Sequence, residues 1–407
     1  MKRRGVRGGA LVVAAVLVAV VGTLPAPASG QTLRERLDEA LAVKGVSRAK
    51  TGAFAFNLRT GRVVYGWQGR RSFKPASNEK LGVALAALRR LGASYRIRTA
   101  IIGAGSRNGA TWRGRLFLKG YGDPTLGADD LRRLARKLRA AGIRRVTGRI
   151  VGDETYFDAR RTAPGWRASY YKIESPPLSA LVANRARVSG RTVDKPALAA
   201  AKAFRKALVA AGIAVAGRAA TGPAPSGSPG LAVVRSKTVA AIVRRMNKIS
   251  DNFYAEMLVK HLGAVLRDKG TTAAGCRVIR RVLQTRNVPL AGVRIADGSG
   301  LSLYNRATAR AVGAILVAAW RDPAVRDPFF SSLAIAGVDG TLEERMRTGP
   351  AHGRVRAKTG TLNTASALSG YVGTRYVFSI LQNDSPISWT RARRSQDRFA
   401  QTLARTL

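Results

Sequence analysis

The sequence predicts a mixed α/β (α+β) fold in which one domain is built from both ends of the chain and a second domain is inserted between them. Residues 51–57 and 62–67 alternate like strands, and similar segments recur close to the C-terminus. Strands near the two ends need partners, so the simplest arrangement pairs the two sets in one sheet. The chain has 407 residues, 46% of them hydrophobic, which is enough for two or three domains with proper cores.

Residues 1–28 are typical of a secretory signal peptide. Four basic residues precede an apolar run over residues 10–24, and Ala26-Pro27-Ala28 is a small-residue cleavage site. The apolar run is too short for a comfortable membrane span. The sequence therefore predicts an exported protein that works outside the cytoplasmic membrane and keeps no transmembrane anchor after cleavage.

The first domain is expected to combine residues 29–94 with residues 231–407. A helix at residues 32–43 and a hairpin of the two N-terminal strands lead into a helix that begins near Ser77. That helix is apolar on nearly every side and should be buried. Beyond residue 230 we expect a strand at 231–235, helices at 238–248, 253–265, 271–286 and 307–319, strands at 354–358, 367–372 and 376–382, and a final helix at 390–407.

Residues 95–230 are expected to form the inserted domain, because the chain changes there to short strands with helices among them. The strands are expected at 95–102, 112–119 and 145–151, and the helices at 127–141 and 196–211. The segment ends in a stretch rich in Gly, Pro and Ser at residues 222–230, which is typical of a linker or exposed loop.

Composition limits the chemistry that is available. The single cysteine, Cys276, excludes an intrachain disulfide, and only two histidines, His261 and His352, are present for zinc sites or histidine-dependent triads. We therefore expect no metal and no cofactor, and a lysine as the base. The formal charge of +48 is spread along the chain. It indicates either attachment to anionic wall polymers or a plain bias toward arginine.

Ser77 and Lys80 are the candidate nucleophile and base. Three residues along a helix place two side chains on one face, so the lysine would stand beside the hydroxyl. The same spacing occurs at Ser47–Lys50 and Ser169–Lys172, but neither of these opens an apolar helix. Taken alone, Ser77 could equally be an ordinary helix cap.

Two further short patterns supply the remaining groups that acyl transfer needs. Ser250-Asp251-Asn252 precedes a predicted helix, and Lys358-Thr359-Gly360-Thr361 lies in the C-terminal strands. Ser250 could relay a proton, Asn252 could hold Lys80 or a substrate amide, and Lys358 could lower the pKa of Lys80. Gly360 would let a substrate backbone approach, while Thr359 and Thr361 offer hydroxyls to a terminal carboxylate.

With these three patterns the chain resembles the D-alanyl-D-alanine carboxypeptidase/endopeptidase family of penicillin-binding proteins, low-molecular-mass class C type. The resemblance extends to Gly122-Asp123-Pro124, to residues 297–302 with Asn305, and to residues 337–342. It implies a β-lactamase/DD-peptidase-like transpeptidase domain, with an antiparallel sheet flanked by helices. It also implies a secreted serine D-Ala-D-Ala carboxypeptidase that trims peptidoglycan stem peptides and is acylated by β-lactams; cleavage of cross-links as well is left open.

Three other functions would each explain part of the sequence. A β-lactamase would not need the inserted segment, and a cationic wall-binding protein with a vestigial site would not need every hydroxyl, lysine and asparagine of the three patterns. A nucleic-acid binder would explain the charge, but the signal peptide removes the protein from nucleic acid. Residues 184–196 are short at a place where the family is expected to carry a further nested domain.

Overall fold

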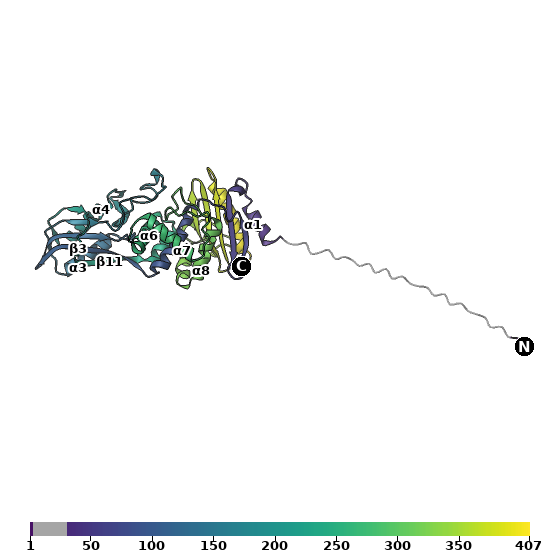
Figure 1. Cartoon of the computed structure of the whole chain (residues 1–407), viewed down its shortest axis with the longest axis horizontal. Coiled ribbons are helices and arrows are strands. Elements are labelled where there is room, and N and C mark those ends of the chain that lie inside the picture. The colour runs from purple at the N-terminus through teal and green to yellow at the C-terminus, as the bar shows by residue number, and fades with distance from the viewer. Residues whose placement is uncertain (3–30) are drawn as a thin grey trace.

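The computed structural model describes residues 1–2 and 31–407. The predicted signal peptide, residues 1–28, lies outside the described residues apart from its first two. Figure 1 shows an elongated molecule in which α1 (Leu33–Leu41) and the C-terminus lie close together at one end. In the part of the chain that is described, no helix is long and apolar enough to span a membrane.

The first sheet has six antiparallel strands and joins the two ends of the chain. Its order is β12-β13-β14-β15-β1-β2, so β1 of the N-terminal hairpin lies beside β15. Thr51 pairs with Gln382 and Asn57 with Tyr376. The antiparallel sheet that the resemblance implies is thereby confirmed. The strands are β1 (Thr51–Asn57), β2 (Arg62–Trp67), β12 (Ala334–Ile335), β13 (Val355–Leu362), β14 (Ala365–Val372) and β15 (Tyr376–Asn383).

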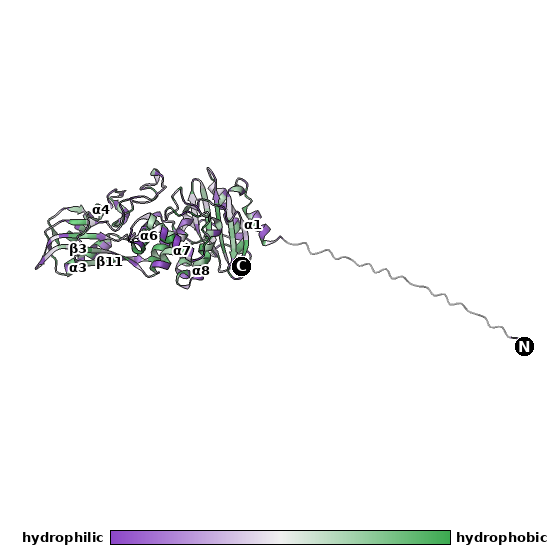
Figure 2. Cartoon of the chain, viewed as in Figure 1, coloured by the Kyte–Doolittle hydropathy of each residue, from purple (hydrophilic) through white to green (hydrophobic). Residues whose placement is uncertain are grey.

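Both faces of this sheet are buried, because alternate residues of each strand point to opposite sides. Ala53 and Phe378 pack with Phe399 of α10 (Trp389–Ala404) and with α1. Phe54 and Val377 face the other way and join the helical core. Figure 2 shows α1 as largely hydrophilic, beside the more hydrophobic strands of this sheet.

The helical core surrounds α2 (Glu79–Leu91), in which every residue from Glu79 to Leu88 is buried. Small residues such as Gly82 and Ala86 allow the neighbouring helices to pack closely around it. Its neighbours are α5 (Val239–Lys248), α6 (Asn252–Arg267), α7 (Thr272–Thr285), α8 (Ala309–Arg321) and α9 (Pro323–Ser332). The sequence did not predict α9. Pro323 reads as a helix breaker, but here it occupies the first turn, where no backbone N–H is needed.

The second sheet is built from the middle of the chain. Its main strands are β3 (Arg96–Asn108), β4 (Thr111–Gly120), β6 (Ile150–Asp153), β10 (Ala219–Thr221) and β11 (Gly230–Thr238), with short strands β5 (Arg145–Val146) and β9 (Ala214–Val215). Helices α3 (Ala128–Ala140) and α4 (Pro196–Ala210) pack together and share its core. Residues 184–196 hold a single 3-10 turn, Asn184–Ala186, and a short hairpin before α4 begins; the hairpin pairs β7 (Arg187–Val188) with β8 (Arg191–Thr192).

The strand expected at residues 231–235 belongs to this second sheet. It forms β11, which pairs antiparallel with β3. Its short run of apolar residues predicted a strand but carried no information on the partner. We therefore propose that the inserted unit ends near Thr238, whereas the sequence places the boundary at residue 230.

Candidate active site

Ser77 lies in a single 3-10 turn, Ala76–Asn78, that leads directly into α2. Lys80 follows within the first turn of the helix, and its Nζ donates to Ser77 Oγ at 2.9 Å. Ala76 has φ 47°, a left-handed conformation that a residue with a Cβ adopts at a cost. The strained turn holds Ser77, which is partly exposed, at the start of a buried helix.

Lys80 is fully buried and donates to three acceptors. Besides Ser77, its Nζ donates to Asn252 Oδ1 at 2.8 Å and to the Ser299 carbonyl at 2.5 Å. Burial lowers the pKa of Lys80 to about 8, although the carboxylates of Asp297 and Glu256 act in the opposite direction. A lysine with this pKa is neutral for part of the time near neutral pH, as a general base must be.

Asn252 is the first residue of α6, and Asp251 caps that helix by accepting from Tyr254 N–H at 3.2 Å. The cap fixes the direction in which Asn252 points, toward Lys80. Ser250 has φ 59° and comes immediately before the cap. Among the described residues, the hydrogen bonds that join Ser77, Lys80 and Asn252 do not include Ser250.

Strand β13 carries Lys358, Thr359, Gly360 and Thr361 past the Ser77 turn. A Cβ on Gly360 would come within 2.9 Å of the Pro75 carbonyl oxygen, so glycine is required for this close approach. Thr359 Oγ1 donates to Thr341 Oγ1 at 2.8 Å. Thr361 is exposed.

One edge of β13 is free along the second half of the strand. β12 pairs only with Arg356 and Ala357, whereas β14 pairs along the whole of β13. In the described part of the chain, no strand pairs with Thr359 to Leu362 on the side away from β14. The Thr359 carbonyl accepts from Lys358 Nζ and the Leu362 carbonyl from Trp389 Nε1, whereas the backbone of Thr361 lies at the open edge. An extended peptide can add to such an edge as a further strand.

Lys358 is fully buried, and its Nζ donates to the Thr359 carbonyl at 3.0 Å. Burial places its pKa well below the ordinary lysine value, and the charge of Lys80 lowers it further. The sequence led us to expect that Lys358 would lower the pKa of Lys80. In the structure, burial is the main cause of the lowered pKa of Lys80. The repulsion between the two lysine charges instead lowers the pKa of Lys358.

The loop that follows Asp297 supplies the Ser299 carbonyl, a contact that the sequence did not predict. Asp297 organises the loop by accepting from Gly300 N–H at 2.9 Å, Ser302 N–H at 2.7 Å and Asn305 Nδ2 at 2.6 Å. Gly300 has φ 86°, and a Cβ there would lie 1.9 Å from the Ala76 carbonyl oxygen. Glycine therefore lets the loop press against the Ser77 turn.

Glu256 of α6 holds the same loop through two of its backbone N–H groups. Its Oε1 accepts from Gly298 N–H at 3.0 Å and from Ser299 N–H at 2.7 Å, and the side chain is fully buried. Burial and the nearby Asp297 raise its pKa to about 8. Through these two hydrogen bonds Glu256 positions the Ser299 carbonyl that accepts from Lys80.

Replacing Glu256 should disturb both stability and chemistry. We expect Glu256→Ala to lower the free energy of unfolding by roughly 1–3 kcal/mol for each of the two buried N–H donors left unpaired. Acylation by penicillin should slow as well, because the Ser299 carbonyl is released. Glu256→Gln keeps an accepting oxygen and should restore most of both properties. Denaturant unfolding and acylation kinetics measure the two effects, and an undiminished acylation rate in Glu256→Ala would exclude the positioning role.

The inserted segment supplies one wall of the site. Asn252 Nδ2 donates to the backbone oxygen of Glu174 at 3.2 Å and to its Oε2 at 3.3 Å. Trp166 Nε1 donates to Asp297 Oδ2 at 2.9 Å, and Trp166 and Tyr170 pack against an apolar cluster. The cluster consists of Ala76, Leu301, Leu362 and Ala365. No local pattern in the sequence marks Glu174 as part of the site.

The chain is similar to known proteins in both sequence and fold. The sequence profile of the D-Ala-D-Ala carboxypeptidase 3 (S13) family matches residues 33–192 and 183–406. A D-alanyl-D-alanine carboxypeptidase of Actinomadura sp. (strain R39) is 31% identical over 479 aligned residues, which cover 94% of this chain and 88% of the relative. The aligned length exceeds the 407 residues of this chain, so the relative contains segments that this chain lacks. The two profile segments meet at 183–192, where the short β7–β8 hairpin lies.

Solved structures show the same fold. Penicillin binding protein 4 of Haemophilus influenzae superposes with a TM-score of 0.79 at 22% identity, covering 91% of this chain and 98% of that one. The same protein complexed with a β-lactam superposes with a TM-score of 0.71 at the same identity and coverage. Taken with the profile match over most of the chain, these likenesses show that the protein belongs to the D-Ala-D-Ala carboxypeptidase 3 (S13) family of serine peptidases.

Proposed function

We propose that the protein is an exported D-Ala-D-Ala carboxypeptidase that removes the terminal D-alanine of peptidoglycan stem peptides through an acyl-enzyme on Ser77. The observation that carries the proposal is the pair of contacts from Lys80 Nζ to Ser77 Oγ and Asn252 Oδ1. A buried lysine of lowered pKa beside a hydroxyl at a helix start is the arrangement that serine acylation requires. Family membership supports the choice of substrate.

In the proposed reaction Ser77 Oγ attacks the carbonyl carbon of the terminal peptide bond and its proton passes to neutral Lys80. Backbone N–H groups at the start of α2 would stabilise the oxyanion. The carbon–nitrogen bond then breaks, and Lys80 returns the proton to the leaving D-alanine amine, with Ser250 as the relay. Water completes the cycle by attacking the ester, which releases the shortened peptide and regenerates the serine.

The free edge of β13 is the proposed place for the substrate backbone. A peptide added there would carry its terminal carboxylate toward Thr359 and Thr361, with Lys358 behind them. Burial holds the pKa of Lys358 well below the ordinary lysine value, and a carboxylate brought close would favour its charged form. The lysine would therefore recognise the carboxylate that distinguishes a chain end from an internal peptide.

This role predicts a specific loss in Lys358→Ala. We expect kcat/KM for a pentapeptide with a free terminal carboxylate to fall about 10- to 100-fold, the value of a hydrogen bond to a charged group. The C-terminal amide of the same peptide lacks the carboxylate, so it should already be a poor substrate of the unaltered protein. Its kcat/KM should therefore fall little further in the variant. Lys50→Ala, at an exposed lysine paired with Asp384, is a matched control. An equal loss for acid and amide would contradict carboxylate recognition.

Three incubations test the function as a whole. The protein is exposed to a fluorescent penicillin, to a stem pentapeptide and to a cross-linked muropeptide. A stable covalent adduct with release of free D-alanine supports the proposal, and cutting of the cross-link would add endopeptidase activity. Rapid turnover of penicillin without an adduct would instead favour a β-lactamase. A wall-binding protein with a vestigial site would show neither adduct nor product.

Acylation by β-lactams is proposed because these compounds resemble the same peptide end, and it is supported by the β-lactam complex of the Haemophilus influenzae protein. Export is proposed from residues 1–28 alone. Cell fractionation of the full chain, compared with a chain that lacks residues 2–28, measures it. Equal retention of both chains in the cytoplasm would contradict export.

A further inference from the structure

Two adjoining grooves on the helical side of the molecule are lined by arginine and by no acidic residue. The first has a volume of about 820 Å³ and is lined by Arg89, Arg90, Arg267, Arg281 and Arg286. The second, of about 650 Å³, shares Thr285 and Arg286 with the first and adds Arg310 and Arg321. We call the two together the arginine groove.

Most of these charges are not neutralised by neighbouring groups. Asp322 pairs with Arg286 at 2.7 Å and with Arg89 at 3.3 Å. Within residues 31–407, no ion pair engages the other five, which are all exposed. Cations gathered in a hollow raise the local potential and attract anions. One carboxylate for seven guanidinium groups leaves a strong positive excess.

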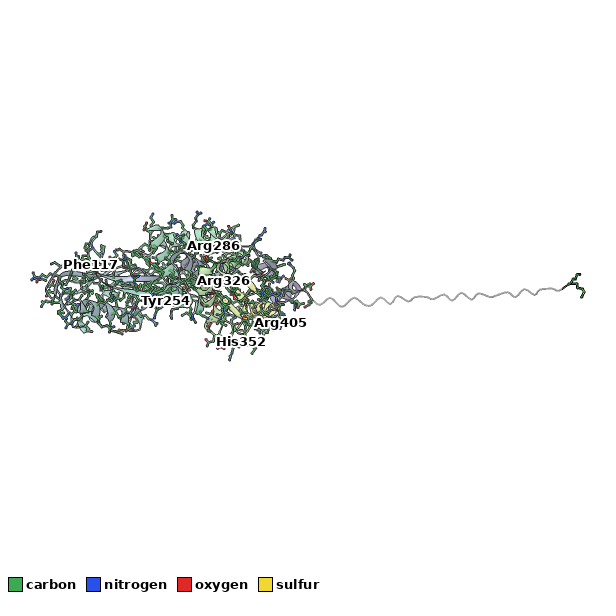
Figure 3. All side chains as sticks on the ribbon, turned by 90° about the horizontal axis from the view of Figure 1, so that it is seen from below. Phe117, Tyr254, Arg286, Arg326, His352 and Arg405 are labelled. Carbon is green, nitrogen blue, oxygen red and sulfur yellow. The ribbon has the colours of Figure 1, made fainter. Side chains whose placement is uncertain are left out.

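The arginine groove has fewer acidic neighbours than the composition of the whole chain would supply. The chain has 71 Lys and Arg against 23 Asp and Glu, so acidic neighbours are expected beside seven arginines. A third hollow, between α1 and α10, meets that expectation. It contains Arg36, Arg345 and four further arginines, but also Glu39, Glu344 and Asp397. Figure 3 places Arg286 of the arginine groove and Arg405 of this third hollow at different edges of the molecule.

The arginine groove lies at the far end of α2 from the catalytic serine. Arg89 and Arg90 are in the last turn of the helix, and Lys80 is in its first turn. Arg90 follows Lys80 by ten residues, which at 1.5 Å each separates the two places by about 15 Å along the helix. A molecule bound in the groove would leave the Ser77 site open, and the buried helix would hold the two sites at a fixed separation.

We propose that the arginine groove binds a linear polyanion with phosphate or carboxylate groups along its length, and so holds the enzyme on an anionic polymer of the wall. Guanidinium groups match the geometry of phosphate and carboxylate with paired hydrogen bonds. Seven such groups spread over two joined hollows suit a chain of repeated charges better than a single small anion. The peptide substrate near the polymer would then be within reach of Ser77.

Binding of labelled polyphosphate and polyglutamate tests the groove directly. The variant Arg90→Glu, Arg267→Glu, Arg281→Glu reverses three exposed arginines that contact no catalytic residue. The control Arg113→Glu, Arg145→Glu, Arg149→Glu makes the same change of charge at exposed arginines of the second sheet. We expect the groove variant to bind about tenfold more weakly or worse and the control nearly as the unaltered protein. Equal losses in both variants, or none in the groove variant, would overturn the proposal.

Binding to purified cell walls shows which wall polymer supplies the anionic groups. Walls are used untreated, stripped of phosphodiester polymers, or with their carboxylates amidated. Loss of binding in one arm supports the proposal and names the polymer; binding that survives both treatments, or that survives 1 M salt, where the screening length is about 3 Å, overturns it. Penicillin acylation of the dissolved groove variant should be unchanged, whereas its release of D-alanine from untreated walls should fall.

Discussion

Ser77→Ala should abolish covalent labelling by a fluorescent penicillin, whereas Ser169→Ala should be labelled like the unaltered protein. The Ser77 hydroxyl is the group that Lys80 Nζ contacts at 2.9 Å at the start of a buried helix. Ser169 also precedes a lysine by three residues, but its 3-10 turn, Ala168–Tyr170, does not continue into a helix, and Lys172 donates to Asp194 instead. The same spacing in sequence therefore predicts opposite results in the two structural settings.

The Ser77→Ala protein should remain folded. Its lost hydroxyl donates to the Ser299 carbonyl at 3.3 Å and accepts from Lys80 Nζ at 2.9 Å. Lys80 keeps its two other acceptors and Ser77 is partly exposed, so the free energy of unfolding should change by only about 1 kcal/mol. Thermal unfolding of the variant checks this. Labelling that persists in a folded Ser77→Ala protein would refute the assignment, and a peptide map of the adduct would identify the true nucleophile.

Five of the six strands of the first sheet could be predicted from sequence because a strand-like pattern of apolar residues is a local property. The two-residue β12 (Ala334–Ile335) was not predicted, because it is too short to show such a pattern. Phe54 and Val377 lie in segments of this kind, and both occupy the core that the pattern indicates. The pairing of the N-terminal strands with the C-terminal strands was predicted because each set needs hydrogen-bonding partners in a sheet. The partner of β11 could not be predicted, because its pattern suits either sheet.

The part of the candidate site in which side chains of short sequence patterns carry the chemistry could be predicted from sequence. Ser77, Lys80 and Asn252 were named in advance, and the structure brings them into contact. The Ser299 carbonyl was not foreseen, since every residue has a carbonyl and no residue type marks the one that is used. Glu174 was missed for a related reason: its contact with Asn252 depends on how the inserted segment folds back over the first sheet.

Lys80→Ala should slow acylation by penicillin by about 10²- to 10⁴-fold, the usual contribution of a positioned general base. The variant removes the group that accepts the Ser77 proton and also the contact that links Ser77 to Asn252. Lys50→Ala, which changes an exposed lysine with the same spacing from a serine, is the control. Acylation of Lys80→Ala at the unaltered rate would show that another base operates.

The pH dependence of acylation distinguishes this base from its neighbours. Only neutral Lys80 can accept a proton, so the rate should rise about tenfold per pH unit and level off near pH 8, the pKa to which burial lowers this lysine. An ordinary lysine would level off only above about pH 10. Glu256 has a raised pKa of about 8 as well and could produce the same limb. Glu256→Gln separates the two, because it should keep the rise with pH if Lys80 is the base and lose it if the titration belongs to Glu256.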